Sequence, residues 1–444
     1  MKIILPGNVS TIINTLNEAG FEAYAVGGCV RDSLMGRIPN DWDITTNASP
    51  EEVKALFRRT LDTGIEHGTV TVMFDKEGYE VTTYRIDGKY EDGRHPTEVT
   101  FTKCLKEDLL RRDFTINAMA YNDTEGLVDI FGGMEDIENK IIRCVGNPEA
   151  RFSEDALRLL RAIRFAAQLS FTIEEETAEA MKKIAPNLVK ISAERIQVEL
   201  VKTVVSDNPG MIKDAYSLGL TKYFMPELDV AFETKQDNPH HCYSVGDHMV
   251  KAMENVPAGK CLRLAMLLHD IEKPSCKFFD ADGVAHFYGH PVKSAEKAKE
   301  ILKRLKFDND TIKRVCRLIE HHDERIEPGE KAMRRAMKRI GEDLFPDLMS
   351  VQLADINAQS DYKRDSKLAR NEANVADMNA IFDSKRCVSL KSLAVTGKDL
   401  IAEGMKPGPG IGDVLEAMLD EVVENPEHNE REFLLSMFHD TINK

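Results

Sequence analysis

The residues best suited to phosphoryl chemistry begin at two adjacent glycines, Gly27 and Gly28, which follow a short apolar run. Adjacent glycines let the backbone turn tightly and lie close to a phosphate chain. A short helix is predicted over residues 30–35, and it would carry Arg31 and Asp32 beside this turn. The pattern therefore favours a phosphate-binding turn with an arginine and an acid next to it.

An Asp-x-Asp pair, Asp41 and Asp43, follows the glycine turn. A strand is predicted over residues 41–44, and because strand side chains alternate, both carboxylates would face one way, about 7 Å apart. Carboxylates placed in this way can share divalent cations. Glu80, on a strand predicted over residues 79–85, is a candidate third carboxylate. A phosphate cradle followed by a metal-holding acid pair is what nucleotidyl transfer needs.

The order Gly-Gly-x-Val-Arg-Asp, then Gly-Arg-x-Pro-x-Asp-x-Asp, resembles the bacterial CCA-adding enzymes, class II tRNA nucleotidyltransferases of the polymerase β superfamily. The resemblance implies transfer of CMP, CMP and AMP from CTP and ATP to the 3′ end of tRNA. It also implies two Mg²⁺ ions held by Asp41 and Asp43. Gly28, Arg31 and Asp32 are then candidate nucleotide contacts.

A second stretch that matches the family covers residues 107–122, Glu-Asp-Leu-Leu-Arg-Arg-Asp-Phe-Thr-Ile-Asn-Ala-Met-Ala-Tyr-Asn. Arg111 and Arg112 are the candidate functional pair, because guanidinium forks suit triphosphate oxygens. By resemblance, Arg112 contacts the incoming nucleotide. Asp113 and Asn117, four residues apart on a predicted helix face, are expected to support that geometry.

A helix with an apolar face is predicted over residues 152–168, and it makes Asp155 and Arg158 neighbours, three residues apart. A simple ion pair would explain them. Base chemistry offers a second interpretation, because a carboxylate acceptor and a guanidinium donor together match the edges of cytosine and adenine. Guanine and uracil present the reverse order and would leave buried groups unpaired, at about 1–3 kcal/mol each. The family places its nucleotide-reading motif here, and Arg161 and Arg164 are further candidate nucleotide contacts.

A polar, glycine-bearing loop is predicted over residues 86–96 and includes His95. The family carries a flexible loop at this position, which switches addition from C to A, and usually has an arginine where His95 stands. The loop favours a full CCA-adding enzyme over one that adds only C-C. A plain surface loop is the other interpretation.

Eight of the 12 histidines fall between residues 240 and 322. His269-Asp270 ends an apolar run and resembles the HD phosphohydrolase superfamily, whose adjacent His and Asp bind metal at the centre of a helical bundle. The candidate ligands of such a site are His248, His269, Asp270, His290, His322 and Asp355.

This resemblance implies a possible divalent metal at the histidines, since imidazole and carboxylate suit a transition metal or magnesium. A metal-bound water could attack a phosphoester. His322 is preferred to His321 because an acid, Asp323, follows it directly. A structural remnant without turnover is the alternative.

Lysines and arginines are dense between about residues 300 and 340, as on a solvated helix face or in a groove for the tRNA backbone. They are Lys303, Arg304, Lys306, Arg334, Arg335, Lys338 and Arg339. Residues 396–423 resemble the tail of the family, which meets the outer part of tRNA and reads it by shape.

The elements that position these residues change along the chain. Strand and helix patterns alternate over the first 130 residues or so, where Ser49 is the predicted N-cap of a helix, and nearly all patterns after residue 150 are helical. The predicted fold is α/β, a polymerase β-like nucleotidyltransferase head followed by all-α regions. The predicted regions are a head over 1–145, a helical neck over 146–230, an HD-type metal domain over 231–365 and a helical, tRNA-binding tail over 366–444.

Composition limits the classes that fit. No apolar run approaches 18 residues and no signal peptide is evident, so we expect a cytoplasmic protein without a membrane span. The formal net charge of −16 argues against broad, non-specific binding to nucleic acid, although a local basic groove is compatible with it. The eight scattered cysteines argue against a zinc ribbon or a disulfide framework.

Three rival functions match parts of the pattern. A bacterial poly(A) polymerase would share the head. A metal-dependent phosphohydrolase would use the histidines, with a head that only binds RNA. A tRNA-binding protein without catalytic activity would bind tRNA but would not turn over nucleotides. The Asp-x-Asp pair, the loop over residues 86–96 and the nucleotide-reading motif favour CCA addition.

Overall fold

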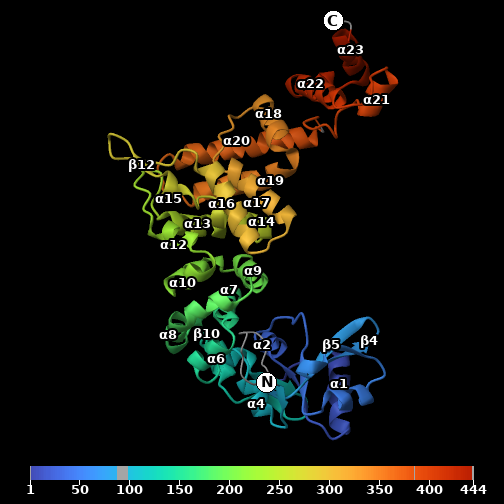
Figure 1. Ribbon diagram of the computed structural model, residues 1–444, viewed down its shortest axis with the longest axis vertical. Helices are drawn as coiled ribbons and strands as arrows, with labels where there is room; N and C mark the ends of the chain where they lie inside the picture. Colours follow the sequence, from blue (N-terminus) through green and yellow to red (C-terminus); the bar gives the residue numbers. More distant parts are fainter. Residues whose placement is uncertain (1, 88–98, 385, 443–444) are drawn as a thin grey trace. The chain divides into compact units, whose positions relative to one another are not determined.

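The computed structural model describes residues 2–87, 99–384 and 386–442 (Figure 1). They divide into two compact units, residues 1–226 and 227–444. This division falls close to the predicted border at residue 230, and the finer division into four regions stays a prediction. Most of the loop predicted over residues 86–96, with His95, lies outside the described residues.

The first unit contains a seven-stranded mixed sheet with the strand order β3-β4-β5-β2-β1-β8-β9. Its strands are β1 (Ala23–Val26), β2 (Ile44–Thr46), β3 (Thr60–Gly64), β4 (Thr69–Phe74), β5 (Glu77–Thr83), β8 (Met119–Asn122) and β9 (Gly126–Asp129). Strands β2 and β5 pair in parallel, and the other neighbours are antiparallel. A separate pair joins β6 (Arg85–Asp87) to β7 (Val99–Phe101). The predicted α/β head is confirmed.

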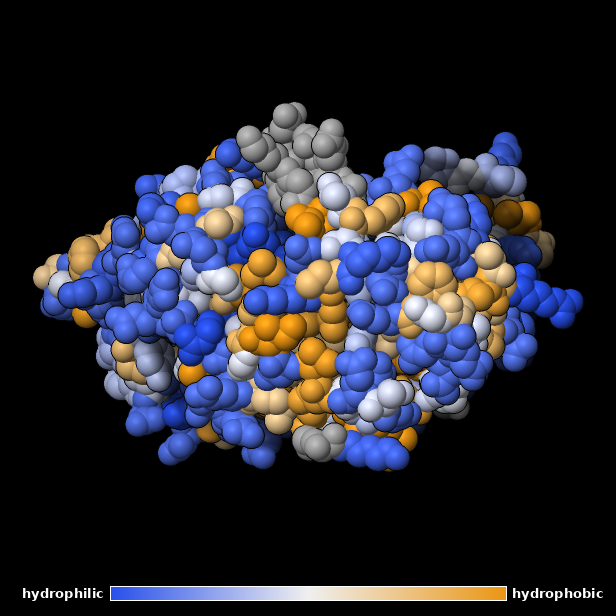
Figure 2. Space-filling view, turned by 90° about the horizontal axis from the view of Figure 1, so that it is seen from below, coloured by the Kyte–Doolittle hydropathy of each residue, from blue (hydrophilic) through white to orange (hydrophobic). Residues whose placement is uncertain are grey.

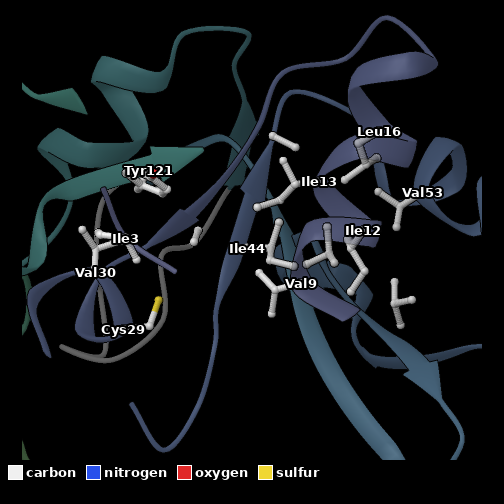
Figure 3. Close-up of a cluster of buried hydrophobic side chains, with 14 of the residues drawn as sticks. Ile3, Val9, Ile12, Ile13, Leu16, Cys29, Val30, Ile44, Val53 and Tyr121 are labelled. Carbon is white, nitrogen blue, oxygen red and sulfur yellow. The ribbon is translucent and has the colours of Figure 1, made fainter. Parts of the chain in front are cut away.

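Helix α1 (Gly7–Glu18) packs on this sheet through one face. Its apolar residues recur at positions 9, 12, 13 and 16, the spacing of one side of a helix. They are buried in one core with Ile44 of β2 (Figure 3). The same core takes in Val30 of α2 (Gly28–Leu34), so packing of the sheet also fixes the helix that follows the glycine turn.

The first unit has nine further α-helices among its described residues. They are α3 (Pro50–Leu56), α4 (Leu105–Leu110), α5 (Gly133–Glu138), α6 (Pro148–Glu154), α7 (Leu157–Leu169), α8 (Glu175–Ile184), α9 (Ala193–Val204), α10 (Ile212–Ser217) and α11 (Thr221–Phe224). Helix α7 packs on α9, and α6 packs on α8. Strands β10 (Ile141–Ile142) and β11 (Thr172–Ile173) pair in parallel.

The second unit is built from helices, as predicted for the later part of the chain (Figure 1). They are α12 (Glu227–Glu233), α13 (Val245–Glu254), α14 (Lys260–Leu268), α15 (Lys273–Cys276), α16 (His290–Arg304), α17 (Asn309–His321), α18 (Glu330–Ile340), α19 (Phe345–Asn357), α20 (Arg364–Asp383), α21 (Gly397–Ala402), α22 (Gly410–Glu424) and α23 (Arg431–Ile442). A hairpin of β12 (Phe278–Phe279) and β13 (Ala285–His286) lies between α15 and α16.

Several cations of the basic stretch between residues 300 and 340 pair with acids of the same unit. Lys338 Nζ lies 2.7 Å from Asp420 Oδ1, and Arg335 contacts Glu424. These contacts join α18 to α22. The structure therefore favours the interpretation of these cations as parts of charged helix faces over that of a bare groove for a tRNA backbone.

Hydrophilic residues cover most of the face shown in Figure 2, with apolar residues gathered among them. None of the helices in the described ranges combines the length and the apolar character that a membrane crossing requires.

The start of α3 offers a test of the local helix signals. Ser49 Oγ accepts from Glu52 N at 3.3 Å, and Glu52 Oε2 accepts from Ser49 N at 2.7 Å, which completes a capping box. We expect Ser49→Ala to lower the free energy of unfolding by about 1 kcal/mol. Urea unfolding followed by the fluorescence of Trp42 measures this loss, because Trp42 is the single tryptophan and packs on the core of the first unit.

Ser192 provides the matched control for this test. It occupies the N-cap position of α9, yet its side chain makes no capping hydrogen bond. Ser192→Ala is therefore expected to change the free energy of unfolding by less than about 0.5 kcal/mol. Equal losses in the two variants would contradict the importance of the capping box.

Candidate functional site

The glycine turn lies at the end of β1 and begins helix α2. Gly27 is the N-cap residue, with a φ of 85°, a conformation that residues with a Cβ rarely adopt. A Cβ at this position would stand 2.9 Å from Arg112 Nη1, so the glycine also makes room for that guanidinium. The Gly27 N–H donates to Met119 O of β8 at 3.1 Å. The turn is thus fixed by the sheet and held in close contact with Arg112.

Asp41 and Asp43 lie in the segment that leads into β2, and the prediction that they stand on the strand is wrong because β2 begins at Ile44. Asp43 O accepts from Val26 N at 3.0 Å, which holds the segment beside the end of β1. The parallel register pairs Ile44 with Val81, so Asp43 stands next to Glu80 of β5. The fold brings the acid pair to the glycine turn and to a third carboxylate.

These carboxylates share one electrostatic environment. Burial raises the pKa of Asp43, the Arg112 guanidinium opposes that rise, and Asp41 adds to it. Burial also raises the pKa of Glu80, with further contributions from Asp43 and Asp41. Burial first and neighbouring negative charge second thus raise both carboxyl pKa values, and a divalent cation at this point would favour the ionised carboxylates.

The Arg111 and Arg112 side chains are anchored on one buried acid. Arg111 Nη2 and Arg112 Nη2 lie 2.8 Å and 3.5 Å from the two carboxylate oxygens of Asp108. Although burial raises the pKa of Asp108, the two guanidiniums hold it below its ordinary value. Arg112 Nε is buried and has no hydrogen-bond partner among the described residues. Arg112 therefore keeps one buried donor available for a ligand oxygen.

A buried chain of polar contacts runs from α2 to α7. Arg31 donates from Nε to Asp32 Oδ1 at 2.9 Å and from Nη1 to Asn117 Oδ1 at 2.5 Å. Asp113 continues the chain, because its Oδ1 accepts from Asn117 Nδ2 at 3.1 Å and its Oδ2 from Arg161 Nε at 2.7 Å. Although burial raises the pKa of Asp113, Arg161 and Asn117 hold it well below its usual range.

This contact forms without the helix that the sequence predicted. Asp113 precedes a 3₁₀ turn, Thr115–Asn117, and does not share a helix with Asn117. The predicted supporting contact between the two side chains is nevertheless present. Arg161, predicted as a nucleotide contact, bonds to Asp113 and so acts on the position of α7.

Phe165 of α7 lies under three guanidinium groups, those of Arg31, Arg161 and Arg164, with the Arg164 carbon 3.8 Å from the ring centroid. Arg164 Nε also donates to Glu199 Oε2 of α9 at 2.5 Å. The Arg164 guanidinium is therefore engaged by protein groups, and it links α7 to α9. The arrangement fits a positioning role for Arg164 better than direct contact with a nucleotide.

The predicted helix over residues 152–168 is broken between α6 and α7. Asp155 has an extended backbone, with φ −139° and ψ 103°, and its Oδ1 accepts from Leu157 N, the first residue of α7, at 3.0 Å. Its Oδ2 accepts from Arg195 Nη2 at 2.7 Å. Arg158 Nη1 donates instead to Glu154 Oε2 at 2.7 Å. The prediction of one continuous helix that carries Asp155 and Arg158 on one surface is therefore wrong.

A second site lies in the other unit, where four histidines converge. His248, His269, His290 and His322 are all buried. Each directs Nδ1 at a backbone carbonyl, those of Ala358, Met266, Phe287 and Ile319, at 2.6 to 3.2 Å. Because Nδ1 carries the proton in such a contact, Nε2 is left as the electron-pair donor. The four rings are thus oriented as metal ligands are.

Asp270 lies at the centre of this cluster. Its Oδ2 is 3.2 Å from His269 Nε2, and its Oδ1 is 3.1 Å from His290 Nε2. Two groups of potential ligands share it, one with His248 and His269 and one with His290 and His322, and the ligand atoms of each group lie within 4.8 Å of one another. Asp355 Oδ1 contacts His248 Nε2 at 2.9 Å.

The structure places His322 and not its neighbour in the cluster. His321 Nδ1 contacts Glu324 Oε2 at 3.0 Å. The six residues predicted from the sequence for this site are thus brought together. Their role as metal ligands stays a prediction.

Sequence reasoning missed several residues that shape both sites. Asp108 lies three and four residues before Arg111 and Arg112, a helix spacing that would have revealed the anchor. Lys273, whose Nζ lies 2.6 Å from Asp270 Oδ2, has the same three-residue spacing. Phe165 gave no signal, since an apolar residue in an amphipathic helix is expected to be core.

Comparisons with known families agree with this geometry. Residues 23–143 match the family model described as "Poly A polymerase head domain". Residues 170–232 match the one described as "Probable RNA and SrmB-binding site of polymerase A". Residues 290–438 match a model for tRNA nucleotidyltransferase domain 2. The fold and the first site thus define a nucleotidyltransferase with a polymerase head.

Relatives that match along the whole chain identify the family within this class of nucleotidyltransferases. The chain is 35% identical to a CCA-adding enzyme of Enterococcus faecalis over 96% of this chain and 93% of that protein. It is also 35% identical to one of Pediococcus pentosaceus, over 96% of this chain and 95% of that protein. A crystal structure of the Bacillus stearothermophilus CCA-adding enzyme in complex with CTP superposes with a TM-score of 0.71 at 29% identity, covering 99% of each chain. The chain belongs to the CCA-adding enzyme family and is a tRNA nucleotidyltransferase.

The contact between the glycine turn and Arg112 can be tested with Gly27→Ala. The new Cβ would displace the Arg112 guanidinium, so we expect the half-saturating concentration of a nucleoside triphosphate to rise about 10-fold or more, a loss near 1.4 kcal/mol. Equilibrium binding measured alongside thermal unfolding separates this loss from general destabilisation.

Gly20→Ala is the matched control, because Gly20 has a φ of 87° but nothing lies within 4 Å of the point where its Cβ would stand. Both variants carry the strain of a positive φ, about 1–2 kcal/mol. Only Gly27→Ala is expected to weaken nucleotide binding. Equal nucleotide affinity in the two variants would contradict the role of the close approach.

Proposed function

We propose that the first unit transfers CMP, CMP and AMP from CTP and ATP to the 3′ end of tRNA. The observation that carries the proposal is the meeting of the coupled carboxylates Asp41, Asp43 and Glu80 with the Arg112 guanidinium beside the Gly27 turn. Likeness to CCA-adding enzymes along nearly the whole chain favours this product over a poly(A) tail.

A pair of Mg²⁺ ions fits the acids of this site. Oxygen donors suit Mg²⁺, and a bound cation offsets the burial and the mutual repulsion that together raise the pKa values of Asp43 and Glu80. When bound, the ions favour ionisation of the attacking 3′-hydroxyl and neutralise the leaving pyrophosphate. In this proposal Asp41 and Asp43 hold both ions, and Glu80 is a candidate third ligand.

The arginines position the triphosphate. Arg112 keeps its contact with Asp108 and offers its buried Nε to a phosphate oxygen. Arg31 and Asp32, at the start of the buried polar chain, lie on α2, which begins at Gly28, and face the sugar and phosphates in the same proposal. A buried donor that gains an acceptor on binding contributes more than an exposed one.

Asp155 and Arg158 are proposed to select the base. A carboxylate acceptor and a guanidinium donor match the N4 and N3 edge of cytosine and the N6 and N1 edge of adenine. Arg158 Nη2 also donates to Arg111 O at 3.0 Å, which places the base-selecting residues next to the triphosphate arginines. Glu154 and Arg195, which contact Arg158 and Asp155, keep the two side chains apart until a base lies between them.

The acid pair gives the direct test of this function. We expect Asp41→Asn to lower the rate of CMP incorporation into tRNA about 10³-fold, because loss of a metal ligand removes several kcal/mol of transition-state stabilisation. Rates from radiolabelled CTP measure the change. Asp62→Asn removes an acid whose side chain is half exposed and pairs with Lys54, and it should leave the rate unchanged. Normal incorporation by folded Asp41→Asn would refute the proposed mechanism.

We infer a second function for the histidine cluster, a divalent metal site that acts on phosphoesters. The observation that favours it is the convergence of four Nε2 atoms on the buried carboxylate of Asp270. A bound metal activates water for attack on a phosphoester. The backbone carbonyls that accept from Nδ1 fix the ring planes and, in the neutral imidazole, leave the Nε2 electron pair for a metal.

Two adjacent histidines test this second function. We expect His322→Ala to lower the bound transition metal at least 10-fold, as loss of a direct ligand does, whereas His321→Ala retains it. Elemental analysis after dialysis against limiting Mn²⁺ gives the metal content. Release of phosphate from a 2′,3′-cyclic nucleotide should be lost with His322→Ala and kept in Asp41→Asn. Equal metal content in both histidine variants would exclude His322 as a ligand.

A further inference from the structure

A cluster of aromatic rings, Phe278, His286 and Tyr288, lies on the hairpin that precedes α16, and this hairpin projects beside α15 (Figure 1). Phe278 and His286 are paired across the two strands. The ring centroids of His286 and Tyr288 are 5.5 Å apart with planes 19° apart, and those of Phe278 and His286 are 5.5 Å apart with planes 29° apart. His286 is thus stacked against each neighbour, while the Phe278 and Tyr288 planes are tilted by 43° to one another.

The ring cluster is exposed although its members are large. Tyr288 is 74% exposed and Phe278 is 44% exposed. Asp280 Oδ2 accepts from His286 Nε2 at 2.7 Å, which holds the imidazole plane in place. Adjoining aromatic faces left in water mark a surface made for a partner. Flat aromatic faces suit the π-face of a nucleobase.

The ring cluster adjoins the histidine site. His286 and Tyr288 line a cavity of about 510 Å³ that is also lined by His290, His322 and Asp355. If the ring of a ligand lies on the cluster, its polar end can therefore extend through the cavity toward the histidines. The volume is in the range of small-molecule pockets.

The cavity is rich in cations although the chain as a whole is acidic. Its wall includes Lys273, Arg325, Lys363, Lys367 and Arg370. In the described parts of the chain no ion pair is formed by Arg325 or Arg370. Of the acids in the wall, Glu324 contacts Arg339 and Asp355 contacts His248, while Asp323 is exposed. An anion such as a phosphate therefore fits this wall.

The charges also orient the ligand. Asp280 and Asp282 lie on the turn of the hairpin beyond the rings, where a phosphate would be repelled. The cavity side carries the cations and the histidines. With the base on the rings and the phosphate in the cavity, the anionic phosphate meets the cations. In the reverse orientation, the phosphate would meet the acids of the hairpin turn.

We propose that the ring cluster stacks on the base of a nucleoside phosphate whose phosphate group enters the histidine cavity. The proposal adds a base-binding subsite to the histidine site and rests on the second function inferred above. The ligand is a free mononucleotide or the terminal nucleotide of an RNA, and the two sources share the base and the phosphate. The aromatic faces give the affinity for the base, and the cations hold the phosphate.

A local fluorescent reporter tests the proposal in the full chain. In a Trp42→Phe background, which removes the single natural tryptophan, Tyr288→Trp puts the fluorophore in the ring cluster. We expect AMP to quench it saturably and adenosine more weakly, while inorganic phosphate causes no quenching. Adding Phe278→Ala should raise the half-saturating AMP concentration about 10-fold, as loss of a stacking ring does. A C-C-A trinucleotide tested beside AMP distinguishes an RNA end from a free nucleotide.

Phe382→Trp in the same background is the control, because Phe382 is 40% exposed on α20 outside the cavity wall. It should show no saturable quenching. Absence of quenching by both AMP and the trinucleotide in the Tyr288→Trp variant would overturn the proposal, as would equal quenching by inorganic phosphate. The metal content of the two histidine variants is measured independently, so a failure of stacking is distinguishable from a failure of the metal site.

Discussion

The first unit depends on one ion pair, between the buried Asp113 and the partly exposed Arg161. Asp113 lies on the head and Arg161 on α7, and the carboxylate is fully enclosed among its partners. A buried carboxylate is tolerated only when it is paired and hydrogen-bonded, so loss of Arg161 would leave Asp113 with Asn117 as its remaining side-chain partner among the bonds described above. Through Asn117 and Arg31 the pair is continuous with the helix that follows the glycine turn. The position of α7, and of the base-selecting residues at its start, is therefore set by the same contacts that set the phosphate-binding turn.

Much of the head could be predicted from the sequence because its signals are local. Adjacent glycines, the Asp-x-Asp pair and the N-cap at Ser49 each act within a few residues, and each is present in the structure. The strand at Asp41 and the helix through Asp155 were predicted wrongly for one reason. In both places a polar side chain or a backbone group takes a partner from a distant part of the chain: Asp43 O accepts from Val26 N of β1, and Asp155 Oδ2 accepts from Arg195 Nη2 of α9. Tertiary contacts of that kind leave no periodicity in the sequence.

The histidine cluster shows the complementary case. Its residues are spread from position 248 to position 355, so no local sequence pattern predicts that they meet. The resemblance to the HD phosphohydrolase superfamily nevertheless predicted the six residues that the fold brings together. The resemblance did not predict a role for Lys273 or for the ring cluster, because their role depends on the cavity that they line. The basic cavity could not be predicted from the net charge of −16, because a net charge sums over the whole chain and does not show where the cations gather.

The central claim is that a protein site, and not a nucleic-acid template, selects C, C and A in turn. The most direct measurement is sequencing of the product end after tRNA without its terminal C-C-A is incubated with Mg²⁺ and all four nucleoside triphosphates. The account predicts addition of C-C-A followed by a stop, with no incorporation of G or U. A long run of A, a mixture that includes G and U, or an unchanged tRNA end would contradict it.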